Sequence, residues 1–270
     1  MSFRLTPEEI ARKDRDGFVV RRGVFSRAEC ARIAGDVEAL IDDMLKLKRE
    51  NKEVVGSYMF EWQEEVGAVV KWEPLFPDVV QGIEPFAHIS RPLNEWAHDP
   101  RFMDPSRDFV GQDDINLFTE KLTMKRAHTG GELILHQDYP YWMRWAGQAD
   151  RIMTALLYLD DATMENGCLE VAPGSHTEGM KKRKDIEGFG QNEMDPAAFE
   201  QSLVPVEAPA GSIVFFGAFL VHRSRINRSD KDRRALLYSY QPAGLKTSYE
   251  LHRESRQPAK KPKAEAAAAR

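Results

Sequence analysis

The sequence has few cysteines, no long apolar segment and no surplus of basic residues. Among its 270 residues only Cys30 and Cys168 are cysteines, too few for a disulfide framework or a cysteine-rich zinc site. No apolar run approaches the roughly 20 residues that a membrane-spanning helix needs, and the charged N-terminal stretch lacks the apolar core of a signal peptide. With 38 basic and 43 acidic residues, the net charge of −5 is unlike the basic footprint of nucleic-acid binders. We therefore expect a soluble, cytoplasmic protein that binds neither nucleic acid nor membranes.

The first part of the chain, residues 1–114, is predicted to be mainly helical. Thr6 and Ser26 each stand three residues before a glutamate, which is the spacing of a capping box at the start of a helix. After Ser26, apolar residues recur with helical spacing over residues 30–45. One or two further helices are expected before Gly111, whose lack of a side chain suits a helix end.

From about residue 115 the sequence changes to short apolar or alternating runs separated by glycine, proline, asparagine and aspartate. Several short strands at such intervals are typical of a sandwich or barrel. We predict a mainly β fold with flanking helices: a double-stranded β-helix, or jelly roll, over residues 115–245, buttressed by the N-terminal helices. The whole is expected to form one domain, residues 1–252, followed by a basic tail, residues 253–270.

Two polar residues interrupt an apolar run in the stretch LILHQDYPYW. His136 and Asp138 are two positions apart, so in a strand their side chains point to the same face. Alone, the pair is compatible with a defect in the core, an ion pair or two metal ligands. His222 also follows an apolar strand, SIVFFGAFLV. Two imidazoles and one carboxylate with open coordination positions suit non-haem Fe(II), whereas a closed four-ligand zinc site leaves no such positions.

The residues that follow His222 offer partners for a carboxylate. Arg233 lies eleven residues after His222, at the start of the next apolar run. A guanidinium there can hold the far carboxylate of 2-oxoglutarate through a bidentate pair. Ser224, two residues beyond His222, points the same way and adds a hydroxyl donor.

Together these motifs resemble the phytanoyl-CoA dioxygenase (PhyH) family of Fe(II)/2-oxoglutarate-dependent oxygenases, which includes ectoine hydroxylases. The segment NGCLEVAPGSH also resembles a turn-and-strand segment of that family. The residues that carry the resemblance are the H-x-D element and the distal histidine with its H-x-S-x-x-N-x-S-x-x-x-R pattern: His136, Asp138, His222, Ser224, Asn227, Ser229 and Arg233.

The resemblance implies a dioxygenase that uses iron, 2-oxoglutarate and O₂. It implies that His136, Asp138 and His222 bind Fe(II), and that the cosubstrate leaves as succinate and CO₂ while a C–H bond of a small metabolite is hydroxylated. An amino-acid-like compound or a natural-product intermediate is the expected substrate. Desaturation, epoxidation or rearrangement remain alternatives, whereas halogenation is disfavoured because related halogenases replace the carboxylate with a small residue.

Further residues are predicted to surround the cosubstrate and the substrate. Lys125 resembles a strand lysine of the family, and Thr123 stands where ectoine hydroxylases carry asparagine, so both are candidates for binding 2-oxoglutarate. Tyr139 and Trp142 are interpreted either as a substrate wall or as packing at the rim, and His128 either as a pocket residue or as part of a surface loop.

Two other functional classes remain open from the sequence. One is a catalytically inactive jelly-roll protein that binds a small molecule, and the other is a cupin-like enzyme that uses a different metal without a 2-oxo acid. The oligomeric state is not readable from the sequence.

Overall fold

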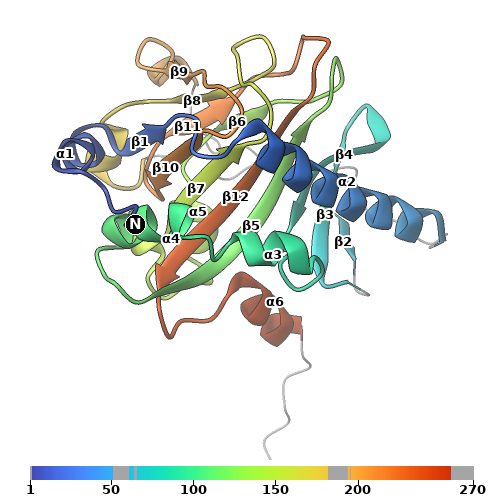
Figure 1. Ribbon diagram of the computed structural model, residues 1–270, viewed down its shortest axis with the longest axis horizontal. Helices are drawn as coiled ribbons and strands as arrows, with labels where there is room; N and C mark the ends of the chain where they lie inside the picture. Colours follow the sequence, from blue (N-terminus) through green and yellow to red (C-terminus); the bar gives the residue numbers. More distant parts are fainter. Residues whose placement is uncertain (1, 51–60, 64–65, 182–193, 195, 257–270) are drawn as a thin grey trace, which may run out of the picture.

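The computed structural model describes residues 2–50, 61–63, 66–181, 194 and 196–256. Two antiparallel β-sheets face each other, and helices cover the outer face of the larger sheet (Figure 1). This arrangement confirms the predicted mainly β jelly roll with flanking helices.

The described strands form one eight-stranded and one four-stranded sheet. The larger sheet has the order β1-β10-β7-β12-β5-β4-β3-β2. Its strands are β1 (Phe18–Arg21), β2 (Glu61–Gln63), β3 (Ala68–Glu73), β4 (Phe76–Glu84), β5 (Ile115–Lys125), β7 (Met153–Tyr158), β10 (Ile213–Gly217) and β12 (Arg233–Pro242). The smaller sheet has the order β6-β11-β8-β9, and its strands are β6 (Leu133–His136), β8 (Leu169–Val171), β9 (Val204–Val206) and β11 (His222–Ser224).

Three helix ends lie where the sequence signals them. Thr6 and Glu9 form the predicted capping box at the first helix. At the second helix the backbone N–H of Ser26 donates to the Glu29 carboxylate, and the backbone N–H of Glu29 donates to the Ser26 hydroxyl. Gly111 ends the fourth helix with a left-handed φ of 78°. The helices are α1 (Pro7–Asp16), α2 (Arg27–Glu50), α3 (Arg91–Trp96), α4 (Pro100–Val110), α5 (Tyr139–Trp142) and α6 (Ser248–Arg256), with 3-10 turns at Ala149–Arg151, Ser175–Glu178 and Pro196–Ala198.

Alternation along β5 and β12 divides their side chains between two cores. Leu122 and Tyr238 belong to the core under the helices. Arg233 of β12 pairs directly with Lys125 of β5, and Thr123 lies two residues before Lys125 on β5. Because directly opposed residues of antiparallel strands point to the same face, these three polar residues face the smaller sheet. The pleat therefore turns a row of polar groups into the interior of the jelly roll.

The prediction that residues 1–114 are mainly helical was wrong for part of this segment. Strands β2, β3 and β4 lie within it, and β4 joins the larger sheet by pairing with β5. Strand β1 is the short β-like run expected after Gly17. In β3, the alternation of buried and half-buried residues over Ala68–Glu73 is the pattern of a strand with unequal faces. Of the predicted tail, residues 253–256 belong to α6, and residues 257–270 lie outside the described part of the chain.

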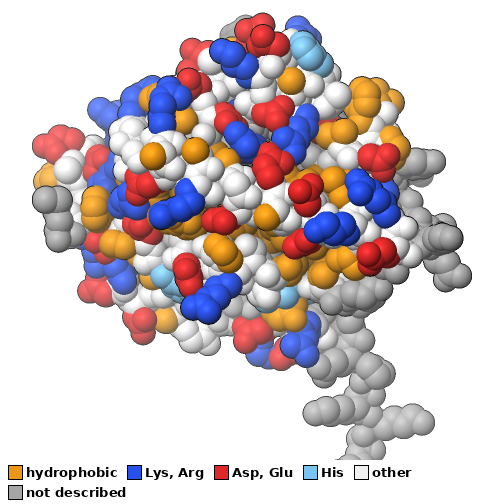
Figure 2. All heavy atoms as spheres, turned by 45° about the vertical axis from the view of Figure 1, so that its right-hand side comes forward, with side chains coloured by type: hydrophobic (Ala, Val, Ile, Leu, Met, Phe, Trp, Pro, Cys, Tyr) orange, Lys and Arg blue, Asp and Glu red, His pale blue; other side chains and the backbone are white. Residues whose placement is uncertain are grey.

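The mixed surface charge and the free cysteines are what the composition leads us to expect. Figure 2 shows basic and acidic side chains interspersed over the face that it presents. Cys30 and Cys168 are both buried and form no disulfide. Within the described ranges, no helix combines the length and the apolar character needed to cross a bilayer.

Glu120, buried on the helix-facing side of β5, predicts a pH-dependent stability. Burial raises the pKa of Glu120 to about 7, although the backbone amides of Phe86 and Ala87 both donate to its carboxylate. Folded Glu120 thus holds its proton more tightly than the unfolded chain does. Its contribution to the free energy of unfolding is complete below pH 4.5 and is lost as the pH rises through about 7, by at most about 3 kcal/mol. We expect Glu120→Gln, which keeps the acceptor, to remove this loss.

Urea unfolding of wild type and Glu120→Gln at about pH 5 and pH 8.5 measures the effect. The variant minus wild-type difference in unfolding free energy should increase with pH. Parallel pH profiles for the two proteins would show that Glu120 does not titrate in this range.

Candidate metal centre

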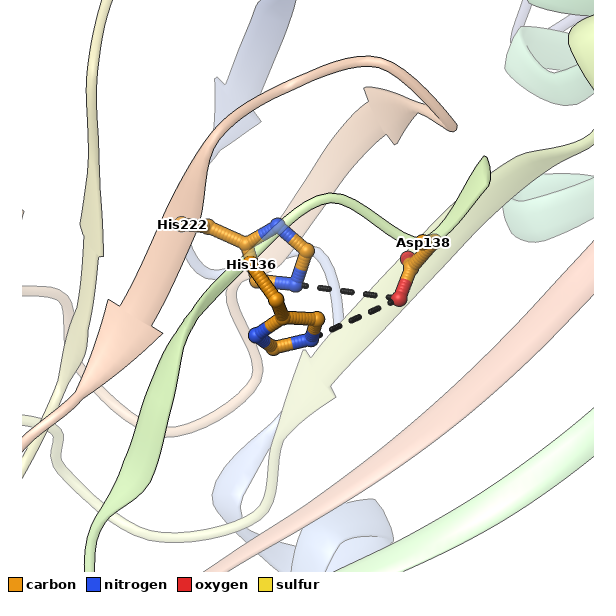
Figure 3. Close-up of side chains that lie close together, drawn as sticks. All are labelled: His136, Asp138 and His222. Atoms are coloured by element: carbon orange, nitrogen blue, oxygen red, sulfur yellow. Dashed lines mark ion pairs between the residues drawn. The ribbon is translucent and has the colours of Figure 1, made fainter. Parts of the chain in front are cut away.

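Two histidines from paired strands and an aspartate just after one of them converge at the smaller sheet (Figure 3). His136 ends β6 and His222 begins β11, and the two residues are direct partners in the β6–β11 pairing. Asp138 lies two residues after the end of β6, at the N-cap position of α5. Its Oδ1 lies 3.6 Å from Nε2 of His136 and 3.9 Å from Nε2 of His222, and both imidazoles point toward the carboxylate. One donor atom from each residue lies within 4.8 Å of the others, which is a spacing suited to a single metal ion.

The backbone fixes which ring nitrogen of each histidine faces the centre. Nδ1 of His136 lies 2.6 Å from the carbonyl oxygen of Ile134, and Nδ1 of His222 lies 2.9 Å from that of Leu220. A carbonyl oxygen can only accept, so each Nδ1 is the protonated nitrogen and Nε2 of the neutral ring carries the lone pair. Both lone pairs are then available for a metal, and the rings are held in orientation as metal-binding histidines usually are.

The local electrostatics favour the protonation states that bind a metal. Burial, with a further contribution from His136, lowers the pKa of His222 to about 4, in spite of the nearby carboxylate. Burial opposes ionisation of Asp138, but His222 and His136 outweigh it, and the pKa of Asp138 lies below its usual value. Near neutral pH the centre therefore presents a neutral His222 imidazole and an ionised carboxylate, and metal ions bind both in these forms.

Two buried polar groups in the same interior have no partner among the described residues. They are Nε of Arg233 and Oγ of Ser224. Arg233 makes one side-chain hydrogen bond, from Nη1 to Thr123 Oγ1 at 3.5 Å, and only 2% of its surface is exposed. Buried polar groups are almost always hydrogen-bonded, so this pair of unused donors indicates a ligand with acceptor atoms. A carboxylate accepts from both a guanidinium and a hydroxyl.

Lys125 places a second basic group beside Arg233. Its ammonium group donates to the carbonyl oxygen of Gly131, and the side chain is almost fully buried. Burial, together with the charge of Arg233, lowers the pKa of Lys125 to about 6. An anion bound between the two side chains would offset the cost of this burial.

The remaining polar residues of the motif after His222 build the turn that positions this pair. The Asn227 side chain donates to the carbonyl oxygens of Lys125 and Lys231, at 2.9 and 2.7 Å, and accepts from the backbone N–H and the hydroxyl of Ser229. These bonds join the end of β5 to the start of β12. Asn227 and Ser229 therefore hold Lys125 and Arg233 side by side.

A small cleft opens near the three converging residues. It lies against β3, β4 and β5 and reaches Leu133, the first residue of β6. Thr123 and Lys121 of β5 both line it. Lys121 also contributes to the electrostatic environment of Asp138 and His222, which places the cleft next to the candidate metal centre.

The predicted substrate residues are not brought together. Trp142 packs edge-on against Phe118 in a small apolar cluster, with ring centroids 5.6 Å apart, and the Tyr139 ring lies 4.4 Å from that of Phe219. His128 lies on an exposed turn with a φ of 60°, and it is not among the residues that line the cleft. A role for any of the three in substrate binding stays a prediction.

Three further residues lie near the centre. Tyr141 was expected with Tyr139 and Trp142 as a substrate wall or as rim packing, whereas Gln137 and Lys71 were not singled out by the sequence. The Tyr141 ring approaches His136 edge-on at 5.7 Å, because α5 turns this side chain toward the histidine. Gln137 is buried and donates to the carbonyl oxygens of Gly179 and Phe219, which anchors the H-x-D segment. Lys71 lines the cleft from β3. The alternation over Ala68–Glu73 was a signal that could have placed Lys71 on an inner face.

Comparisons with known proteins point to one family. Residues 13–235 match the family model described as Phytanoyl-CoA dioxygenase (PhyH). Phytanoyl-CoA dioxygenase domain-containing protein 1 of Mus musculus is 25% identical, over 86% of this chain and 88% of its own length. L-proline trans-4-hydroxylase of Streptomyces griseoviridis is 31% identical, over 47% of this chain and 54% of its own length. The crystal structure of EctD from S. alaskensis with 2-oxoglutarate and 5-hydroxyectoine aligns with a TM-score of 0.68 at 20% identity, over 88% of this chain and 76% of that one.

Proposed function

The chain belongs to the phytanoyl-CoA dioxygenase family, and from this premise we propose that it is an Fe(II)/2-oxoglutarate-dependent dioxygenase that hydroxylates an unactivated C–H bond of a small metabolite. The observation that carries the proposal is the convergence of His136, Asp138 and His222 beside two unpartnered donors, Arg233 and Ser224. The similar proteins include a proline hydroxylase and a structure holding 5-hydroxyectoine, which supports an amino-acid-like substrate.

The donor set fits iron, and the unpartnered groups fit 2-oxoglutarate. Two imidazole nitrogens and one carboxylate with open positions are the ligand set of non-haem Fe(II) oxygenases. His136, Asp138 and His222 would hold the iron, and Arg233 with Ser224 would hold the far carboxylate of 2-oxoglutarate. When bound, the two together supply activation of O₂, with 2-oxoglutarate leaving as succinate and CO₂.

The protein's own contribution is orientation and charge. The carbonyl groups of Ile134 and Leu220 keep the two Nε2 atoms aimed at the centre. The Arg233 guanidinium and the basic Lys125 form a buried end for a diacid, and Thr123 accepts from the Arg233 guanidinium and holds it in place. Fixing both ends of the cosubstrate in a largely buried interior limits water around the reacting bond.

Anaerobic titration of the Fe(II)-loaded protein with 2-oxoglutarate tests this proposal. We expect a weak metal-to-ligand charge-transfer band in the visible region that saturates with one equivalent of bound cosubstrate. His222→Ala, prepared and loaded in the same way, is the control and should show no band. Absence of the band from folded, iron-loaded wild-type protein would contradict the proposal. A metabolite screen scored by succinate release then identifies the substrate class.

A further inference from the structure

The single helical turn α5 sets the direction of the metal ligand Asp138. Asp138 is the N-cap residue of α5, and its side chain makes no capping hydrogen bond. The carboxylate is therefore not tied to the helix end, and its approach to Nε2 of His136 and His222 depends on where the backbone of Asp138 lies. A helix of four residues is too short to be stable alone in water, so contacts with the rest of the chain must hold α5 in place.

Polar contacts hold the chain at the start of α5. The backbone N–H of Tyr139 donates to the carbonyl oxygen of Ala218 at 3.0 Å, and the side chain of Gln137 anchors the residue before Asp138. The backbone N–H of Tyr141 donates to the carbonyl oxygen of Asp138, which lies within the same turn. Such a bond shapes the turn, but it does not fix the end of the turn against the sheets.

An apolar cluster holds the far end of α5. We call it the α5 cluster, and its members are Phe118, Tyr139, Trp142, Ala146, Ala149, Ile152 and Leu251. Phe118 of β5 and Ile152, which precedes β7, are 2% and 1% exposed and belong to its buried part. Trp142, the last residue of α5, packs edge-on against Phe118. The end of the turn is thus fastened to β5 by side-chain packing.

Leu251 joins the α5 cluster from the C-terminal helix α6, which has anchoring contacts of its own. The Ser248 hydroxyl donates to Oγ1 of Thr119 on β5 at 2.8 Å. The Tyr249 ring stacks on the ring of His88, which follows β4, with the two centroids 3.9 Å apart. Neither contact involves a member of the α5 cluster. The place of α6 is therefore fixed by β5 and by the segment after β4, and Leu251 transmits it to α5.

We propose that Leu251, acting through Trp142 and α5, is a positioning residue for the metal ligand Asp138. The C-terminal helix then contributes to iron binding, although it contains none of the three ligands. Removing the Leu251 side chain leaves space in the α5 cluster, and α5 can shift into it. Such a shift moves the carboxylate away from the two Nε2 atoms. This inference rests on the proposed function, because the ion that Asp138 helps to hold is its iron.

Leu251→Ala tests the positioning role without a change in α5 itself. The Fe(II) dissociation constant, measured by anaerobic equilibrium dialysis without 2-oxoglutarate, should rise about tenfold, because residues that orient metal ligands contribute about 10- to 100-fold to metal affinity. Leu251→Met keeps the volume and the apolar character, so it should bind iron within about twofold of wild type. At saturating iron, the 2-oxoglutarate midpoint of the charge-transfer band should stay within about twofold of wild type in both variants.

Two further variants separate positioning from general stability. Leu45 lies on α2 and is also partly buried, but it packs against the core between the helices and the larger sheet. Leu45→Ala removes the same atoms there, so it should lower the unfolding temperature and leave the iron affinity unchanged. Tyr249→Ala removes the stack with His88 and leaves the α5 cluster intact. It should weaken iron binding in the same direction as Leu251→Ala, by a smaller factor.

Amide hydrogen exchange of the iron-free proteins measures the loosening of α5 directly. Amides of residues 137–146 should exchange at least about threefold faster in Leu251→Ala and in Tyr249→Ala than in wild type, and at the wild-type rate in Leu45→Ala. Exchange that is unchanged in Leu251→Ala would show that Leu251 does not hold α5.

The iron measurements decide the inference. Wild-type iron affinity in Leu251→Ala overturns it, whatever the exchange rates are. An equal loss of iron affinity in Leu45→Ala also overturns it, because the effect would then reflect general stability. A wild-type protein that binds iron but shows no charge-transfer band fails the proposed function, while dialysis and exchange still decide whether Leu251 positions Asp138.

Discussion

Replacing Asp138 with alanine is expected to abolish 2-oxoglutarate turnover and to lower the affinity for Fe(II) by more than about 100-fold. Losing a residue that merely orients a ligand already costs about 10- to 100-fold in metal affinity, so loss of a ligand should cost more. Asp138 supplies the only carboxylate in the candidate metal cluster of the described residues. Without it, two neutral imidazoles are left to hold a dication. The measurements are Fe(II) binding by anaerobic equilibrium dialysis, the charge-transfer band and succinate release.

The alanine variant needs controls for folding and for loss of negative charge. Asp78→Ala removes an acid whose side chain is 87% exposed, and it should bind iron like wild type. Asp138→Asn keeps the size of the side chain and removes its charge, so it should fail in iron binding while its thermal unfolding stays close to that of wild type. Retention of wild-type iron stoichiometry and of the band by Asp138→Ala would show that Asp138 is not a ligand.

The sequence predicted the converging residues because their geometry is local or lies at strand ends. His136 and Asp138 are two residues apart, and His222 follows an apolar strand whose end is visible in the sequence. The pairing of His222 with His136 could not be derived from periodicity, since it joins positions 86 residues apart. The family motif supplied that link.

The lining of the cleft near the metal centre was not predictable for a related reason. Whether Lys71, Glu84 and Lys121 share a face depends on two successive pairings and on bulges within the β3–β4 pair. A shift of one residue in either pairing would turn Lys71 to the opposite face. The sequence shows that a strand exists, but bulges and register are set by contacts between distant segments.

The aromatic residues after Asp138 illustrate a different limit. A substrate wall of Tyr139 and Trp142 was a reasonable expectation for residues directly after the H-x-D strand. The chain instead forms one helical turn, so successive side chains point about 100° apart. This turn sends Trp142 into an apolar cluster and Tyr141 toward His136.

Replacing Arg233 with methionine is expected to separate cosubstrate binding from stability. The variant should need at least about 100-fold more 2-oxoglutarate to reach half of the charge-transfer signal, because a charge-assisted pair to the far carboxylate is lost. The same variant should unfold in the absence of 2-oxoglutarate at the wild-type temperature or above it. Arg233 is buried, and its Nε has no partner among the described residues, so removing the guanidinium leaves no anion unpaired and relieves a desolvation cost.

Arg234, the next residue on β12, provides a matched control with the opposite expectation. Its guanidinium pairs with Asp160 at 2.8 Å and with Glu38 at 3.1 Å, on the other face of the strand. Arg234→Met leaves these two acids without that partner and should lower the unfolding temperature, while the 2-oxoglutarate midpoint stays near that of wild type. Titration of the band and thermal unfolding of both variants measure the two effects. Equal weakening of 2-oxoglutarate binding by both substitutions would mean that the loss reflects the net charge of the strand, and that Arg233 has no specific contact with the cosubstrate.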